Sequence, residues 1–108
     1  MNPSRRVAVL GGVRIPFCKN NTAYFDVGNL GMSIKTLGAL VEKYQLQGEV
    51  LGEVAMGAVL KHSSDWNLAR EATLSSGLSP LTPGITLQRA CGTSLDSIIT
   101  IGNRIATG

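Results

Sequence analysis

The sequence predicts an α/β fold in which strands and helices alternate in the order β-α-β-α-β-α around a parallel sheet. Three observations support this class. Short, continuous apolar runs, typical of strands buried on both faces, alternate with stretches whose apolar residues recur every three or four positions. Glycine and proline separate the two kinds of pattern. The 108 residues are 44% hydrophobic and only 16% charged, which excludes a disordered chain and suits one domain or part of one.

The first predicted strand is the run Val7–Leu10, which ends at a Gly-Gly pair. Pro16 disfavours a helix directly afterwards, so residues 14–17 are expected to be extended and residues 18–28 to form a loop. The Gly-Gly pair lacks the Gly-x-Gly-x-x-Gly spacing of a nucleotide-binding turn, and we interpret it as a turn that ends the strand.

The first predicted helix is capped by Asn29 and ends near Gly48. One apolar stripe runs along it at helical spacing, made by Leu30, Ile34, Leu37, Val41 and Tyr44. Gly38 lies inside this helix, where glycine costs about 1 kcal/mol relative to alanine. We therefore expect Gly38 to pack closely against a neighbouring element.

A second buried strand is predicted at Val54–Leu60, and Gly57 within it indicates close approach of another backbone. The polar loop that follows leads into a short helix ending near Ser76, with Asp65 or Asn67 as its cap. Gly77 is the expected stop signal of that helix.

After a proline-rich turn, the β-prone run Ile85–Leu87 predicts the third strand, and a last helix begins near Cys91 and is capped by Gly108. Apolar residues cover much of the surface of this helix: Leu95, Ile98, Ile99, Ile101 and Ile105. We expect it to be buried between two layers. The chain has too few elements to supply both, which suggests the N-terminal portion of a larger enzyme or a subunit that depends on a partner.

Composition excludes several classes of protein. The net charge of +3 is spread along the chain among few aromatics, so nucleic-acid binding is not indicated. No apolar run approaches the roughly 20 residues of a membrane span, and the N-terminus lacks the apolar core of a signal peptide. Two cysteines are too few for a disulfide scaffold. We expect a cytoplasmic protein with no membrane span.

The segment Gln88–Ser94 is the strongest chemical candidate, because a strand is expected to end there and a helix to begin. A cysteine at that point, Cys91, lies at the positive end of the helix dipole, which favours thiolate over thiol. Backbone N–H groups without helical partners can bind an oxyanion, and Gly92 allows a substrate to approach closely. This layout suits acyl transfer through a thioester. The alternative is a small cysteine buried in the core.

Other candidates are weaker. His62, the only histidine, is expected in a solvent-facing loop, and Cys18 lies in a polar loop with no helix start nearby. The spacings of Cys18, His62 and Cys91 match no zinc motif, so no metal site is predicted. Asp65 and Glu71 make no convincing acid/base pair.

The segment Arg89–Ile98, followed by Gly102 to Gly108, resembles the nucleophile segment of the thiolases, the acetyl-CoA acetyltransferases and 3-ketoacyl-CoA thiolases. Three other stretches resemble the same family in the same order and extend the likeness over essentially the whole chain: Val7–Phe17, Met56–Leu60, and Asn67–Ala72 with Gly77-Leu78. The order and spacing of the four are more specific than any one of them.

The resemblance implies a layered α-β-α-β-α fold made of two similar halves, of which residues 1–108 would be the N-terminal part of the N-terminal domain. It implies that Cys91 accepts an acyl group from an acyl-CoA and passes it to CoA or to an acetyl-CoA carbanion. Coenzyme A thioesters would be substrates, with no bound cofactor. The family's activating His and second Cys belong to Gly-His-Pro and Cys-x-Gly segments, which are absent from this chain, so the fragment alone is expected to be inactive.

Two departures from the family pattern bear on the site. Gln88 stands where the family commonly has Asn, and it can keep an amide hydrogen-bonding role with a longer reach. Thr93-Ser94 replaces the common Ser-Gly and is similar to the branch that includes the thiolase subunits of fatty-acid oxidation complexes. The direction of reaction stays open on this evidence.

The resemblance also implies a homodimer or homotetramer. Arg70 either lies near that subunit contact or is an ordinary surface arginine, and Tyr24, Phe25 and Trp66 suit a partner surface. Three rival functions stay open. The first is another condensing enzyme such as a ketoacyl synthase, and the second is a non-catalytic thiolase-like protein that binds lipid or a partner. The third is a generic nucleotide-binding α/β domain.

Overall fold

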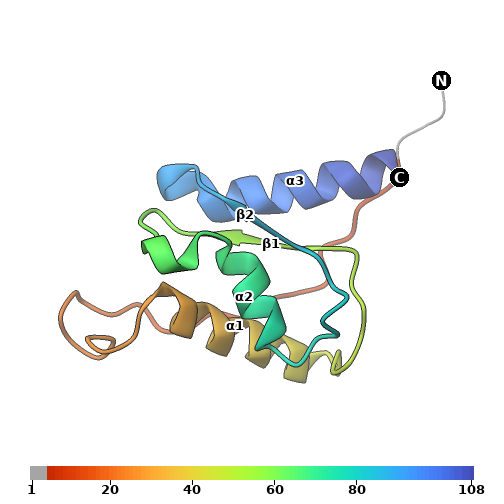
Figure 1. Ribbon diagram of the computed structural model, residues 1–108. Helices are drawn as coiled ribbons and strands as arrows, with labels where there is room; N and C mark the ends of the chain where they lie inside the picture. Colours follow the sequence, from red (N-terminus) through yellow and green to blue (C-terminus); the bar gives the residue numbers. More distant parts are fainter. Residues whose placement is uncertain (1–4) are drawn as a thin grey trace.

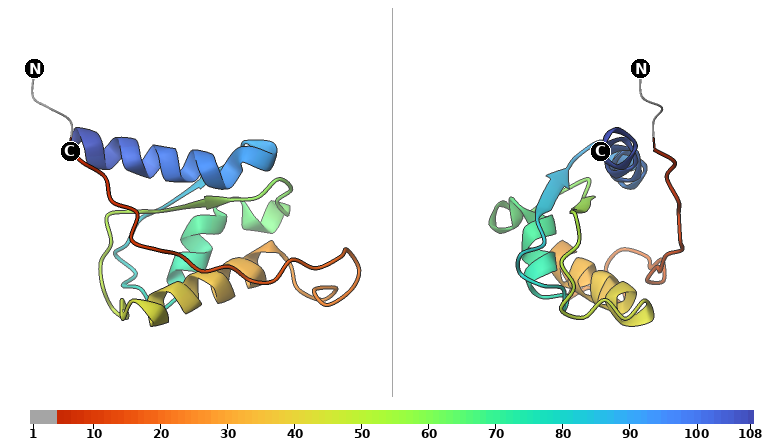
Figure 2. Two further views of the ribbon diagram at one scale, coloured as in Figure 1. Left: turned by 180° about the vertical axis from the view of Figure 1, so that it is seen from behind. Right: turned by 90° about the vertical axis from the view of Figure 1, so that its right-hand side faces the viewer.

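The computed structural model describes residues 5–108 as two parallel strands between helical layers (Figure 1). The elements are α1 (Asn29–Lys43), β1 (Val54–Gly57), the 3-10 turn η1 (Ser63–Asp65), α2 (Leu68–Leu74), β2 (Gly84–Leu87), the 3-10 turn η2 (Ala90–Gly92) and α3 (Thr93–Thr107). The strands pair in parallel, with Val54 opposite Gly84 and Gly57 opposite Leu87. Helix α3 covers one face of the sheet, and α1 and α2 lie on the other (Figure 2). The predicted α/β class with a parallel sheet is confirmed.

The core lies between the sheet and the α1–α2 layer. Its buried members come from α1, β1, α2 and the loop after α2: Leu37, Val41, Val54, Ala72 and Leu78. The apolar stripe predicted along α1 supplies two of them, and its flanking members Leu30 and Ile34 pack against the cluster. Burial of this stripe is what holds α1 on the sheet side, because a helix of this length is marginal in isolation.

The strand predicted at Val7–Leu10 does not form. The segment is extended and runs unpaired beside the strands (Figure 2), with Val9 81% and Leu10 86% exposed. A cavity of about 480 Å³ lies between the segment, β1 and α3. Both flanks of the segment are attached to helices instead: the Arg5 amide donates to the Ala106 carbonyl at 3.0 Å, and Gly12 accepts from Lys43 of α1 at 3.0 Å. These attachments hold the segment away from the edge of β1, so its apolar composition alone does not produce pairing.

Helix α1 departs from the sequence prediction at both ends. Gly28 occupies the N-cap position, and the side-chain amide of Asn29 donates a hydrogen bond to the Leu60 carbonyl instead of capping the helix. The helix ends at Lys43 because Gln45 adopts the left-handed conformation, with φ +54°. An added Cβ at Gly38 would lie 3.9 Å from the Ser76 carbonyl oxygen, which is ordinary contact, so the close packing expected at Gly38 is not found.

Helix α2 agrees more closely with expectation. The Asn67 side chain accepts a hydrogen bond from the Arg70 amide at 3.2 Å, which confirms it as the cap, and Asp65 lies in η1 instead. The helix ends at Leu74, and Gly77 carries φ +95° just beyond it. The strand β1 ends at Gly57, earlier than the predicted Leu60.

Within residues 5–108, helix α3 is covered by the sheet on one face, and this part of the chain supplies no second layer, in line with the expectation that the chain has too few elements for both; burial between two layers stays a prediction. Leu95, Ile98 and Ile99 are exposed, Leu95 most of all at 64%. Gly108 caps the helix with φ +94°, and its amide donates to Ile105 at 3.3 Å, as the sequence predicts. None of the described helices is long and apolar enough to cross a membrane.

Candidate functional site

The turn between β2 and α3 carries Cys91 at the surface of the molecule. Strand β2 ends at Leu87, the 3-10 turn η2 spans Ala90–Gly92, and α3 begins at the next residue. The Cys91 thiol is exposed, so a cysteine sealed in the core is wrong for this structure. Cys91 lies two residues before the first residue of a 15-residue helix, whose dipole gives this end a partial positive charge.

The chain reverses direction at Ala90, not at the glycine. Ala90 has φ +41°, in the left-handed region, whereas Gly92 has φ −93°, which any residue adopts. A non-glycine residue held in this region costs on the order of 1–3 kcal/mol and persists only where its surroundings enforce it. The residue immediately before Cys91 is therefore strained, which no local sequence pattern predicted.

The side chain of Thr93 bridges this turn by hydrogen bonds, a structural role that was not predicted from the sequence. Its hydroxyl accepts a hydrogen bond from the Arg89 amide at 2.9 Å and donates one to the Ala90 carbonyl at 2.8 Å. Threonine near a helix start commonly bonds to nearby backbone in this way, so the signal was present in the sequence. The side chain is buried.

The close approach predicted at Gly57 is confirmed, and it sets where α3 begins. An added Cβ at Gly57 would lie 1.7 Å from the Leu87 carbonyl oxygen and 2.8 Å from the Thr93 methyl carbon. Neither distance is tolerated by a real side chain. The absence of a side chain on β1 is what allows the start of α3 to rest directly on the sheet.

Gly92 provides open space beside the thiol. An added Cβ there would meet only the aliphatic carbons of Arg89, at 3.9 Å. The Gly92 amide donates to the Arg89 carbonyl at 2.8 Å, so this N–H already has a partner inside the turn. That the Gly92 N–H donates a hydrogen bond to an oxyanion stays a prediction.

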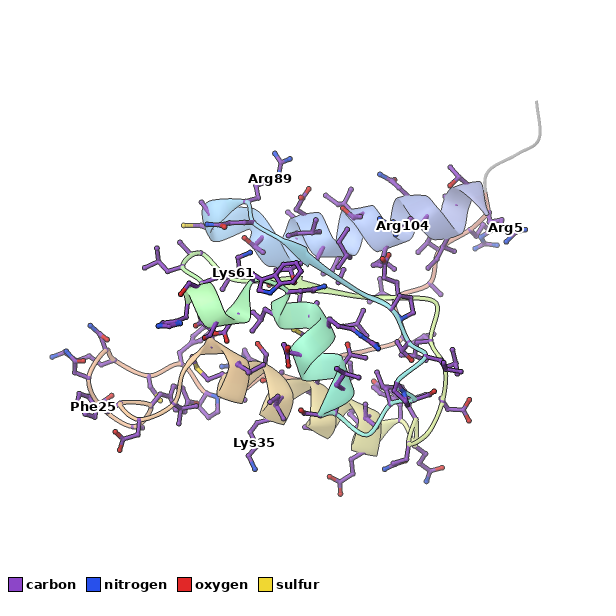
Figure 3. All side chains as sticks on the ribbon, in the orientation of Figure 1. Arg5, Phe25, Lys35, Lys61, Arg89 and Arg104 are labelled. Carbon is purple, nitrogen blue, oxygen red and sulfur yellow. The ribbon has the colours of Figure 1, made fainter. Side chains whose placement is uncertain are left out.

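Gln88 connects the turn to the loop after β1. Its side-chain amide donates to the Val59 carbonyl at 2.8 Å. Arg89 pairs with Asp96 of α3 at 3.3 Å, and Figure 3 shows the arginine projecting outward from the beginning of α3. The arginine is mostly exposed, and Asp96 in the first turn of α3 balances its charge, so the pair adds no net charge beside Cys91 and contributes little to stability.

The remaining sequence candidates lie elsewhere or serve the fold. His62 is exposed, as predicted, and its ring accepts from the Ser64 amide at 3.2 Å to cap η1. Arg70 is half-buried and donates to the Thr82 carbonyl at 2.7 Å, so it links two parts of the same chain.

Cys18 is exposed in the loop before α1. Partial burial of the neighbouring Tyr24 raises the pKa of its phenol, and a hydrogen bond with Cys18 raises it further. Within residues 5–108, no three His, Cys, Asp or Glu side chains form a group that could hold a metal.

Comparison with known sequences gives a consistent result. The family model described as "Thiolase, N-terminal domain" matches residues 7–108. The chain is 33% identical over 103 residues to a 3-ketoacyl-CoA thiolase of Photorhabdus laumondii and 32% identical to one of Shewanella amazonensis. Each match covers 95% of this chain and 24% of the relative, so the chain spans about a quarter of the length of these curated relatives.

The fold is similar to that of a solved structure as well. The acetyl-CoA acetyltransferase of Bacillus anthracis superposes with a TM-score of 0.71 at 24% identity, over 78% of this chain and 21% of that one. At this identity the likeness establishes the fold alone. It agrees with the layered α/β arrangement of α3, the parallel strands and the α1–α2 layer.

Proposed function

Because the chain belongs to the thiolase family, we propose that it supplies the nucleophilic cysteine of an acyl-CoA acyltransferase, with Cys91 as that nucleophile. One observation carries the proposal: the Cys91 thiol is exposed at the beginning of α3, directly after a strained reversal of the chain. An exposed sulfur in a turn between a strand and a helix can be reached by the carbonyl carbon of an acyl thioester.

The proposed chemistry proceeds through an acyl-cysteine. The Cys91 sulfur attacks the carbonyl of an acyl thioester, the C–S bond to CoA breaks, and CoA leaves as a thiol after taking up a proton. In the thiolytic direction the Cys91 sulfur gives up its proton and attacks the 3-keto carbon of a 3-ketoacyl-CoA. The bond between carbons 2 and 3 breaks, and the acetyl-CoA carbanion takes up a proton and leaves as acetyl-CoA. The thiol of a second CoA then attacks the acyl-cysteine and frees Cys91.

Two residues around Cys91 bear on this role. Gly92 leaves space for the thioester beside the sulfur, because an added methyl group would contact only Arg89. Arg89 is paired with Asp96 of the first turn of α3, so the charge of the arginine is balanced and is not assigned a role in stabilising an oxyanion.

A base that activates the thiol is not assigned within this chain. His62 is the only histidine, and its ring already caps η1. We propose that residues 1–108 form the N-terminal part of a thiolase N-terminal domain and that the base and the CoA-binding surface lie in another segment or subunit. On this basis the full enzyme binds no cofactor, uses CoA and acyl-CoA as substrates in the cytoplasm, and assembles as a homodimer or homotetramer or as a subunit of a fatty-acid oxidation complex, and residues 1–108 alone are inactive.

A chimera tests the proposal. The 103 matched residues of the Photorhabdus 3-ketoacyl-CoA thiolase are replaced by the matching 103 residues of this chain. We expect thiolytic cleavage of a 3-ketoacyl-CoA and an acyl adduct on Cys91, found by mass spectrometry after a quench. Cys91→Ala abolishes both, and the matched control Cys18→Ala, which removes the other exposed thiol, leaves both intact. A folded chimera with no adduct would refute the assignment of Cys91.

A further inference from the structure

We propose that Thr93 is a positioning residue for Cys91: its hydroxyl fixes the turn that presents the thiol at the beginning of α3. The inference rests on the proposed function, in which Cys91 is the nucleophile.

The hydroxyl of Thr93 closes a ring of hydrogen bonds around the nucleophile. It accepts from the amide of Arg89 at 2.9 Å and donates to the carbonyl of Ala90 at 2.8 Å. Both partners directly precede Cys91, and Thr93 follows it by two residues. One hydroxyl, with its single donor and one of its acceptor sites used, therefore joins the two sides of the turn.

The strain at Ala90 explains why such bonds are needed. Alanine has no side chain that could bond to its own backbone, and it adopts φ +41° next to the nucleophile. A conformation of this kind relaxes unless bonds from outside hold it. The donation from Thr93 to the Ala90 carbonyl is such a bond, and the Arg89 amide fixes the residue before it.

Burial separates positioning from direct catalysis. Thr93 is 5% exposed, and its methyl group rests where a side chain on Gly57 would otherwise lie. The methyl group packs against β1, and the buried hydroxyl is not accessible to a substrate. Thr93 acts on Cys91 through the backbone of the turn.

Three variants of the 108-residue chain isolate this role. Thr93→Val keeps the shape and removes both hydrogen bonds, and Thr93→Ser keeps the hydroxyl and removes the methyl group. Thr73→Val is the matched control, because Thr73 is equally buried and its hydroxyl donates to the Ala69 carbonyl in α2, away from the turn. The measurement is the rate of iodoacetamide labelling of Cys91 relative to Cys18, resolved by peptide mass spectrometry.

We expect Thr93→Val to lower the labelling ratio at least fivefold, because the thiol leaves the N–H groups at the start of α3. Thr93→Ser is expected to stay within twofold of the wild type, and Thr73→Val to leave the ratio unchanged. A general loss of stability would not produce rescue by serine. An unchanged ratio in Thr93→Val, or an equal fall in Thr93→Ser, overturns the inference.

A measurement on the wild type decides the matter if Thr93→Val does not fold. The Arg89 amide is expected to exchange its hydrogen at least tenfold more slowly than in an unstructured chain, and exchange within twofold of that rate overturns the inference. Neither readout involves CoA. Failure of the chimera to form an acyl adduct therefore rejects the proposed function alone, and failure of these readouts rejects Thr93 alone.

Discussion

Replacing Gly57 by alanine is expected to destabilise the fold more than any other glycine change near the site. The added Cβ would lie 1.7 Å from the Leu87 carbonyl oxygen and 2.8 Å from the Thr93 methyl carbon. The first clash is with backbone of the paired strand, which cannot turn aside as a flexible side chain can. The strands or the start of α3 must separate to relieve it.

The size of the effect follows from this geometry. Forcing an extra methyl group into a packed site typically costs about 1–3 kcal/mol, and a backbone clash belongs in the upper part of that range. For a domain of about 100 residues, a loss of about 2 kcal/mol lowers Tm by roughly 8–16 °C. Urea and thermal unfolding followed by circular dichroism measure both quantities in the Gly57→Ala variant.

Gly38→Ala is the matched control, since the same atom is added at a position where its neighbour lies 3.9 Å away. Alanine favours a helix over glycine, so this variant is expected to gain about 0.5–1 kcal/mol in the free energy of unfolding. A Gly57→Ala protein as stable as the wild type would show that β1 and α3 do not meet at the distance described. A destabilised Gly38→Ala protein would refute the packing assigned to α1.

Three further outcomes test the site. Gly92→Ala is expected to keep the wild-type Tm within about 2 °C, because its Cβ has room, and to lower acyl transfer in the chimera at least tenfold; equal activity would refute the assigned substrate space. Iodoacetamide is expected to label Cys91 at least tenfold faster than Cys18 although both are exposed, and equal rates would remove the argument for an activated thiol. The purified 108-residue chain is expected to show no turnover of acetoacetyl-CoA, and measurable turnover would show that it contains its own base.

Local patterns predicted the helices well and the sheet less well. The apolar stripe of α1 and the Asn67 cap depend on residues within a few positions of one another, and both were found in the structure. The strand expected at Val7–Leu10 required a partner brought close by the rest of the fold. Its flanks are fixed to α1 and α3 instead, which no local pattern reveals.

The site divides in the same way. The position of Cys91 at a helix start followed from the sequence, and the Thr93 hydrogen bonds span only three and four residues, so local reasoning could have found them. The bond from Gln88 to Val59 spans 29 residues and could not be found in that way. The positive φ in the turn also falls on Ala90 and not on Gly92, although glycine is the residue that usually adopts a positive φ, so the sequence could not predict it.

One non-local contact, between Gly57 and Thr93, links the stability of the fold to the reactivity of the thiol. Because an added methyl group on Gly57 meets the Thr93 side chain, Gly57→Ala is expected to displace the hydroxyl that holds the Cys91 turn. At a temperature where the variant remains folded, the labelling of Cys91 relative to Cys18 should fall at least threefold.

Gly84→Ala distinguishes this effect from loss of stability in general. An added Cβ at Gly84 would be crowded too, at 2.8 Å from the Arg70 amide nitrogen, but Gly84 begins β2 at the end opposite the Cys91 turn. Both variants are expected to lose stability, and only Gly57→Ala to lose the labelling preference. If Gly84→Ala lowers the ratio equally, the reactivity of Cys91 follows the overall stability of the sheet, and the contact between Gly57 and Thr93 has no separate part in positioning the nucleophile.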